Sequence, residues 1–173
     1  MTVIASVFVP SARFVIAADG RCRSDDPKNT SFDTDHAQKI FSVENTDSVY
    51  AFALIGMGGT NNGKFVTVDE IRSAASKLAN RRIPDADIYV HNLCHHVQRA
   101  TAKARRDGVI PEFPFNEEAA EDKKRSLFRV LIMGYFNRQP WLFECRFFYT
   151  EDERVKFALD SIQPTDLYSA FAG

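Results

Sequence analysis

The chain has 173 residues, of which 45% are hydrophobic and 26% are charged, and its formal net charge at pH 7 is −1. This length and composition predict one globular domain, residues 1–173, with a substantial buried core. The near-zero net charge argues against nucleic-acid and membrane partners, because both attract proteins through concentrated positive charge.

Three further observations bear on the compartment. No apolar run reaches the ~18 residues of a membrane span, and no basic segment followed by an apolar one marks a secretory signal at the N-terminus. The three cysteines Cys22, Cys94 and Cys145 are odd in number and far apart in the sequence, which is typical of reduced thiols. The sequence therefore predicts a cytoplasmic protein.

The first part of the chain is predicted to consist of β-strands. Runs rich in Val, Ile and Phe indicate a hairpin broken at Pro10-Ser11, followed by two more strands. The predicted strands cover residues 2–9, 13–18, 39–43 and 49–55. Because these strands are apolar on both faces, we expect a sheet that is covered on each side.

Two helices are predicted next. Thr67-Val68-Asp69-Glu70 has the pattern of a capping box with Thr67 as the N-cap, and the helix behind it is expected to end near Asn80. The second helix is expected to begin after Pro84, with Asp85 or Asp87 as its cap, and to stop at Gly108. Apolar residues at offsets of three and four give each helix one core-facing side.

The rest of the chain returns to β-structure after a charged connection over residues 107–126. A second hairpin is predicted at residues 127–135 and 141–149, with its turn at Asn137-Arg138, and further strands at 155–159 and 167–172. Strands and helices are segregated rather than alternating, so an α+β fold is favoured over a doubly wound one. We expect a layered sandwich with the helices outside.

Four short motifs occur in order along the predicted strands. They are Thr2-x-Ile4, Ala17-Ala18-Asp19-x-Arg21, Lys39-Ile40 and Gly56-Met57-Gly58-Gly59. This pattern resembles the N-terminal half of a proteasome β-type subunit, within the N-terminal-nucleophile (Ntn) hydrolases. The resemblance implies a four-layer αββα sandwich, here incomplete at the C-terminus, and a homo-oligomer built as a ring or stacked rings. It also suggests an ATP-dependent unfoldase as a partner.

The resemblance further implies a threonine-type hydrolase that cleaves amide or peptide bonds. Once Met1 is removed, Thr2 carries both a hydroxyl nucleophile and a free α-amine, which can act as its general base. Lys39 is expected to place positive charge beside that amine and Asp19 to pair with Lys39, while the Gly58 N–H faces the oxyanion. Arg21, Gly56 and Met57 are assigned to substrate binding, with Arg21 bracing the loop. No cofactor or metal is expected.

Other interpretations stay open. A non-catalytic structural or assembly subunit of the same fold would need no free Thr2. Gly58 to Lys64 has the spacing of a phosphate-binding loop, but Phe65 stands where that motif has a Ser or Thr. His91 and His95 share one helix face, although no third ligand completes a metal site there, and an exposed polar face explains them better.

Overall fold

The computed structural model describes the following residues: 2–9, 13–18, 38–44, 48–60, 63–79, 81, 83–110, 126–150, 152–162 and 168–172. For residues 2–9, 13, 48 and 168–172 it describes the backbone alone. Asp19, Arg21 and Cys22 lie outside the described residues.

Eight strands and two helices follow one another in three groups within the described residues: four strands, two helices and four strands. The elements are β1 (Thr2–Val9), β2 (Arg13–Ala18), β3 (Ile40–Glu44), β4 (Ser48–Gly56), α1 (Thr67–Leu78), α2 (Ala86–Arg106), β5 (Ser126–Phe136), β6 (Gln139–Tyr149), β7 (Val155–Ile162) and β8 (Tyr168–Ala172). The predicted order of elements is confirmed, with boundaries that differ by at most three residues.

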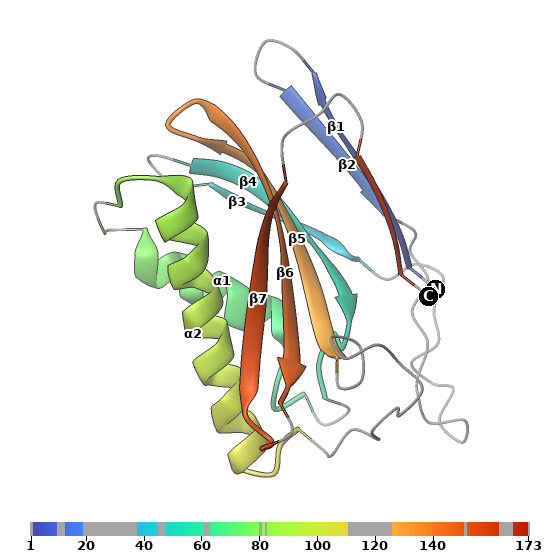
Figure 1. The fold of residues 1–173 in the computed structure, drawn as a ribbon, viewed down its shortest axis with the longest axis vertical. Coiled ribbons are helices and arrows are strands. Elements are labelled where there is room, and N and C mark those ends of the chain that lie inside the picture. Colours follow the sequence, from blue (N-terminus) through green and yellow to red (C-terminus); the bar gives the residue numbers. More distant parts are fainter. Residues whose placement is uncertain are drawn as a thin grey trace.

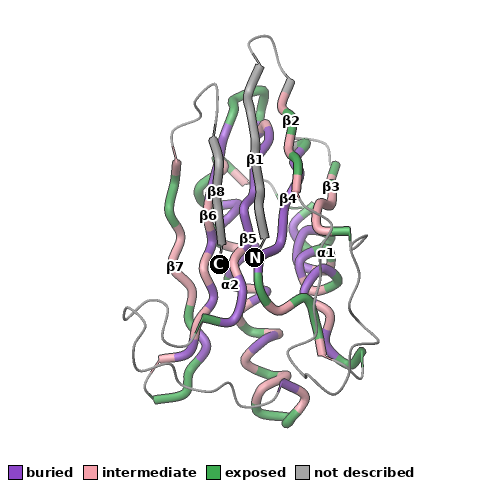
Figure 2. The backbone as a smooth tube through the Cα atoms, turned by 90° about the vertical axis from the view of Figure 1, so that its right-hand side faces the viewer, coloured by how far each residue is buried: buried purple, intermediate pink, exposed green. Residues whose placement is uncertain are grey.

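The strands form two antiparallel sheets. One has five strands in the order β3-β4-β5-β6-β7, and the other has three in the order β2-β1-β8. Thr2 is paired with Ala172, so the first and last strands of the chain run side by side and the two ends of the chain lie together (Figure 2). Figure 1 shows three layers, which are the helices, the five-stranded sheet and the three-stranded sheet. This arrangement confirms the α+β prediction.

The larger core lies between the helices and the five-stranded sheet. The helix α1 contacts β3, and α2 contacts β6 and β7. The buried side chains of the helices recur every three or four residues, as the sequence predicts: Val68, Ile71, Ala75 and Leu78 on α1, and Val90, Cys94, Val97 and Thr101 on α2. Against them lie the helix-facing side chains of the sheet, including Tyr50, Phe52, Phe143 and Phe147.

A smaller core lies between the two sheets. Ala53, Ile55, Leu131, Met133 and Leu142 are buried on the face of the large sheet that is turned away from the helices. Phe14, Ile16 and Ala18 of β2 pack against this cluster, together with Ile40 and Ile162. The alternation along β2 is that of a strand with one covered face.

The intervening residues of β2 are exposed. Val15 retains 55% of its accessible surface, and Ala17 is also exposed. The fourth layer of the αββα sandwich that the resemblance implies is not formed by any element of the described residues.

Local signals were interpreted correctly at two positions and incorrectly at a third. The Asp85 side chain caps α2 by accepting the Ile88 N–H at 2.8 Å, and Asn137 and Arg138 adopt φ of 47° and 66° in the predicted turn between β5 and β6. The prediction of Thr67 as the N-cap of α1 was wrong. Val66 is the N-cap and makes no side-chain cap bond, while Thr67 is the first helical residue. Its hydroxyl is used elsewhere, as described below.

Candidate active site

The strand ends that carry the four motifs meet at one end of the sandwich. Because β1 and β2 are antiparallel, with Ile4 opposite Ala18, the start of β1 lies beside the end of β2. In the large sheet the start of β3 lies beside the end of β4, with Ile40 opposite Ala53. Figure 1 shows the start of β1, the start of β3 and the end of β4 at the lower right of the molecule.

Packing between the sheets holds these ends together. Ala18, the last residue of β2, and Ile40, the first residue of β3, pack against the same small cluster. Asp19 follows Ala18 in the sequence, and Lys39 precedes Ile40. The fold therefore brings Thr2 and Lys39 to the same end of the two sheets, although only the backbone of Thr2 is described. The roles of Thr2, Asp19 and Arg21 stay predictions.

Lys39 lies at the entry to β3. Its side chain is half-buried, and its backbone carbonyl accepts the Leu54 N–H at 3.2 Å. That bond fixes the Lys39 backbone against β4, two residues before β4 ends at Gly56.

The glycine cluster at the end of β4 forms a bend that needs two of its glycines. Gly56 has φ of +96°, and a Cβ there would lie 2.9 Å from the Leu127 carbonyl oxygen. A Cβ on Gly59 would lie 2.7 Å from the carbonyl oxygen of Phe65. Both positions are crowded by backbone atoms that cannot move aside easily, which explains the glycines.

Gly58 differs from both. A Cβ at Gly58 would have nothing within 4 Å among the described atoms, and the residue is exposed. The backbone here is therefore approachable from outside, as a donor to a substrate must be.

Thr67 fixes the orientation of the peptide between Met57 and Gly58. Thr67 is fully buried; its hydroxyl donates to the Met57 carbonyl at 2.8 Å, and its N–H donates to the Gly58 carbonyl at 3.0 Å. In a trans peptide the C=O and the N–H point in opposite directions. Holding the Met57 carbonyl against the start of α1 therefore turns the Gly58 N–H away from the helix.

The Gly58 N–H has no hydrogen-bond acceptor in the part of the chain that the structure describes, whereas the neighbouring Met57 N–H donates to Leu127 at 3.1 Å. An unused, oriented backbone donor is what an oxyanion site requires. The Met57 side chain, by contrast, packs against the core between the helices and the sheet. Its assignment to substrate binding stays a prediction.

The segment from Gly58 to Lys64 has a geometry of its own. Gly59 and Val66 form a β-bridge, and between them the Thr60 N–H donates to the Phe65 carbonyl at 2.8 Å and the Gly63 N–H to the Thr60 carbonyl at 2.9 Å. The loop thus closes on itself, and α1 begins only after it. This arrangement does not favour a phosphate-binding loop, in which backbone N–H groups and the helix N-terminus surround the anion.

His91 and His95 lie on the exposed side of α2. Their ring centroids are 4.7 Å apart, and both rings contact Phe157, at 5.5 Å and 5.1 Å. No group of three potential metal ligands occurs among the described residues. The aromatic contacts account for the pair without a metal.

The sequence interpretation missed two features, one in the site region and one on the outer side of the helices. The role of Thr67 was hidden because Thr-x-x-Glu also describes a capping box; a hydroxyl residue placed after a Gly-rich strand end was the available signal. On α2, Asn92, His95, His96 and Arg99 lie three or four residues apart and so share one face. That pattern could have indicated the pocket that these four residues form with Arg81.

Comparison with known proteins gives one likeness. No family model matches the chain, and no curated protein matches it. The solved structure of "Anbu (ancestral beta-subunit) from Yersinia bercovieri" is similar over 91% of this chain and 60% of that chain, with 11% sequence identity and a TM-score of 0.46. This chain thus spans about 60% of the length of the one it resembles.

At 11% identity and a TM-score of 0.46, this likeness supports no statement about the chemistry of this chain. Neither helix of the described part is long and apolar enough to cross a membrane.

Proposed function

We propose that the protein is a threonine-type N-terminal-nucleophile hydrolase that cleaves amide or peptide bonds, with Thr2 as the nucleophile after Met1 is removed. The observation that supports this most directly is the Met57–Gly58 peptide, whose N–H is oriented and has no acceptor among the described residues. It lies at the end of β4, on the side of the sandwich where β1 begins (Figure 1).

In the proposed reaction the Thr2 hydroxyl oxygen attacks the acyl carbon, and the α-amine of Thr2 takes the hydroxyl proton. An α-amine has a pKa of about 7.7–8.0, which suits a base near neutral pH. The carbonyl oxygen becomes negative and accepts the Gly58 N–H. The tetrahedral intermediate then collapses and expels the leaving amine, which receives the proton from the α-amine of Thr2. An ester on Thr2 remains. Water then attacks the ester and gives a proton to the α-amine. The bond between the acyl carbon and the Thr2 oxygen breaks, this oxygen takes the proton back from the α-amine, and the acid is released.

The other predicted residues support this centre. The ammonium group of Lys39 would lower the pKa of the α-amine and the hydroxyl, because nearby positive charge disfavours their protonated forms. Asp19 would pair with Lys39 and Arg21 would brace the following loop, while Gly56 and Met57 would line the substrate side. The peptide or amide substrate reaches this centre in a cytoplasmic homo-oligomer, with an ATP-dependent unfoldase as a candidate partner.

Covalent labelling tests the proposal. An electrophile that traps N-terminal threonine should add once per chain, and peptide mapping should place the adduct on Thr2. Thr2→Ala should abolish the adduct, and Thr2→Ser, which keeps a hydroxyl, should retain it. An adduct that persists in Thr2→Ala would exclude Thr2 as the nucleophile.

A second candidate is a non-catalytic structural or assembly subunit of the same fold. The exposed Val15 and Ala17 favour it, since together they leave an apolar strip on the outer face of β2 that a further layer or subunit could cover. Retention of Met1 together with a defined oligomer in a sizing experiment would favour this function over catalysis.

A further inference from the structure

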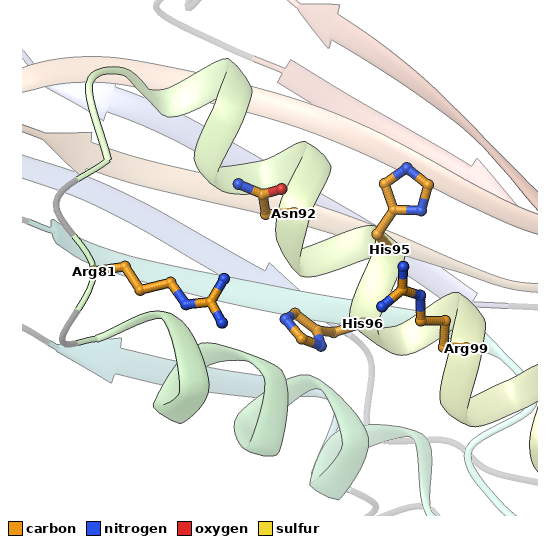
Figure 3. A pocket seen from close by; sticks show the side chains of 5 residues that line it. All are labelled: Arg81, Asn92, His95, His96 and Arg99. Carbon is orange, nitrogen blue, oxygen red and sulfur yellow. The ribbon is translucent and has the colours of Figure 1, made fainter.

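The groove between the two helices holds a pocket that the proposed reaction does not use. It has a volume of about 290 Å³ and is lined by Arg81, Asn92, His95, His96 and Arg99. Arg81 lies just beyond the end of α1, and the other four residues lie on α2. The pocket is on the outer side of the helix layer, across the large sheet from β1 (Figures 1 and 3).

Helix geometry explains why these α2 residues converge. Relative to Asn92, the other three lie three, four and seven positions further on, so all four share one face. The buried stripe of α2, with Leu93, Cys94 and Val97, occupies the opposite side. Figure 3 shows the guanidinium of Arg81 and the ring of His96 directed toward each other across the groove.

The lining is positively charged and lacks an internal counter-charge. The side chains of Arg81 and Arg99 form no hydrogen bond or ion pair with any described residue, and none of the five lining residues is acidic. Arginine stays protonated at any physiological pH. The pocket therefore holds two permanent positive charges whose side-chain donors have no acceptor among the described residues.

The two histidines of the pocket, His95 and His96, contribute ring nitrogens that can form hydrogen bonds. Burial lowers the pKa of His96, and the positive charges of Lys77, Arg81 and Arg99, together with His95, lower it further. On the outer side, Gln98 donates its amide to the Val155 carbonyl at 2.8 Å, so its oxygen must accept the 3.1 Å bond from His95. His95 thus carries a proton on Nδ1, and Nε2 is its other ring nitrogen that can bind a ligand.

We propose that this pocket binds a phosphate group, either as inorganic phosphate or as the phosphoryl end of a small phosphorylated molecule. Planar guanidinium groups match the oxygens of phosphate, and two of them near an imidazole and an amide supply donors from several directions. This proposal does not depend on the hydrolase site, because it involves neither Thr2 nor the glycine bend.

The test is a titration of the purified full chain at low ionic strength with inorganic phosphate, pyrophosphate and glycerol phosphate, followed by calorimetry and by the imidazole NMR signals. We expect saturable binding and a rise in the pKa of His96 on saturation, because a bound anion stabilises the charged ring. Tighter binding of glycerol phosphate than of phosphate would assign a phosphorylated molecule, and equal binding would assign free phosphate.

Three variants locate the site. Arg81→Gln and Arg99→Gln should each weaken binding by about tenfold or more, since each removes a charge-assisted interaction. Arg106→Gln removes the same charge from the far end of α2 and should leave binding unchanged. All three residues are exposed, so circular dichroism should show the same fold. Absence of saturable phosphate binding, or equal weakening in all three variants, would overturn the proposal.

Discussion

Replacing Thr67 with valine tests the link between the start of α1 and the glycine bend. Valine has nearly the shape of threonine but cannot donate to the Met57 carbonyl, whose 2.8 Å bond to the buried Thr67 hydroxyl is itself part-buried. The bond from the backbone N–H of residue 67 to the Gly58 carbonyl would remain. The substitution therefore removes one defined interaction without opening a cavity.

The magnitude follows from the burial of this site. Leaving the part-buried Met57 carbonyl without its donor costs about 1–2 kcal/mol of unfolding free energy. Thr67→Ser keeps the hydroxyl and loses one methyl group, which costs about 0.8 kcal/mol. With a urea m-value of about 2 kcal/mol per molar, a loss of 2 kcal/mol lowers the denaturation midpoint by about 1 M.

Urea denaturation followed by circular dichroism measures this difference, and labelling of Thr2 measures its consequence. Thr67→Val should be the less stable variant, and it should also react more slowly with the trapping electrophile, by about tenfold, because the Gly58 N–H is no longer held in place. Thr67→Ser should react nearly as fast as the native protein. If Thr67→Val were as stable as the native protein, or more stable than Thr67→Ser, the role assigned to the Thr67 hydroxyl would be wrong.

Two further predictions concern the core. Gly134→Ala should lower the unfolding free energy by about 3 kcal/mol or more, because a Cβ there would lie 2.6 Å from the Cα of Tyr50 on the neighbouring strand; thermal denaturation near that of the native protein would refute this. In a Cys22→Ser background, Cys94 and Cys145 should react with iodoacetamide only after unfolding, since both are buried and burial raises the pKa of the Cys145 thiol; rapid alkylation of the folded protein, measured by intact mass, would contradict it.

Hydrophobic periodicity was sufficient to predict the order of elements. The strands of this chain are long and rich in β-branched and aromatic residues, and the helices have one clear apolar side, so local pattern and tertiary packing agree. The turn at Asn137-Arg138 and the cap at Asp85 were also predictable, because each depends on a local bond or backbone conformation.

Contacts between distant segments were not predictable in the same way. Thr67 satisfies the rule for an N-cap, but its hydroxyl has a stronger use ten residues earlier, at Met57. The approach of Cys94 to Cys145, at 2.9 Å between the sulfur atoms, likewise depends on how α2 packs across β6. Sequence spacing alone suggested isolated thiols.

The candidate site depends both on local motifs and on contacts between distant segments, so it was predictable only in part. The motifs nominate Lys39 and Gly58, whose roles stay predictions, and the fold accounts for how β1, β3 and β4 bring such residues to one end of the sandwich. The donor geometry of Gly58 could not be assigned from sequence, because it depends on a peptide plane fixed by Thr67.

The central claim is that Thr2 becomes a free N-terminal nucleophile. Intact mass spectrometry of the purified protein, before and after treatment with an electrophile that traps N-terminal threonine, tests it directly. The account predicts a chain lacking Met1 that gains one adduct on Thr2. A chain that quantitatively retains Met1, or that gains no adduct at Thr2, would contradict it.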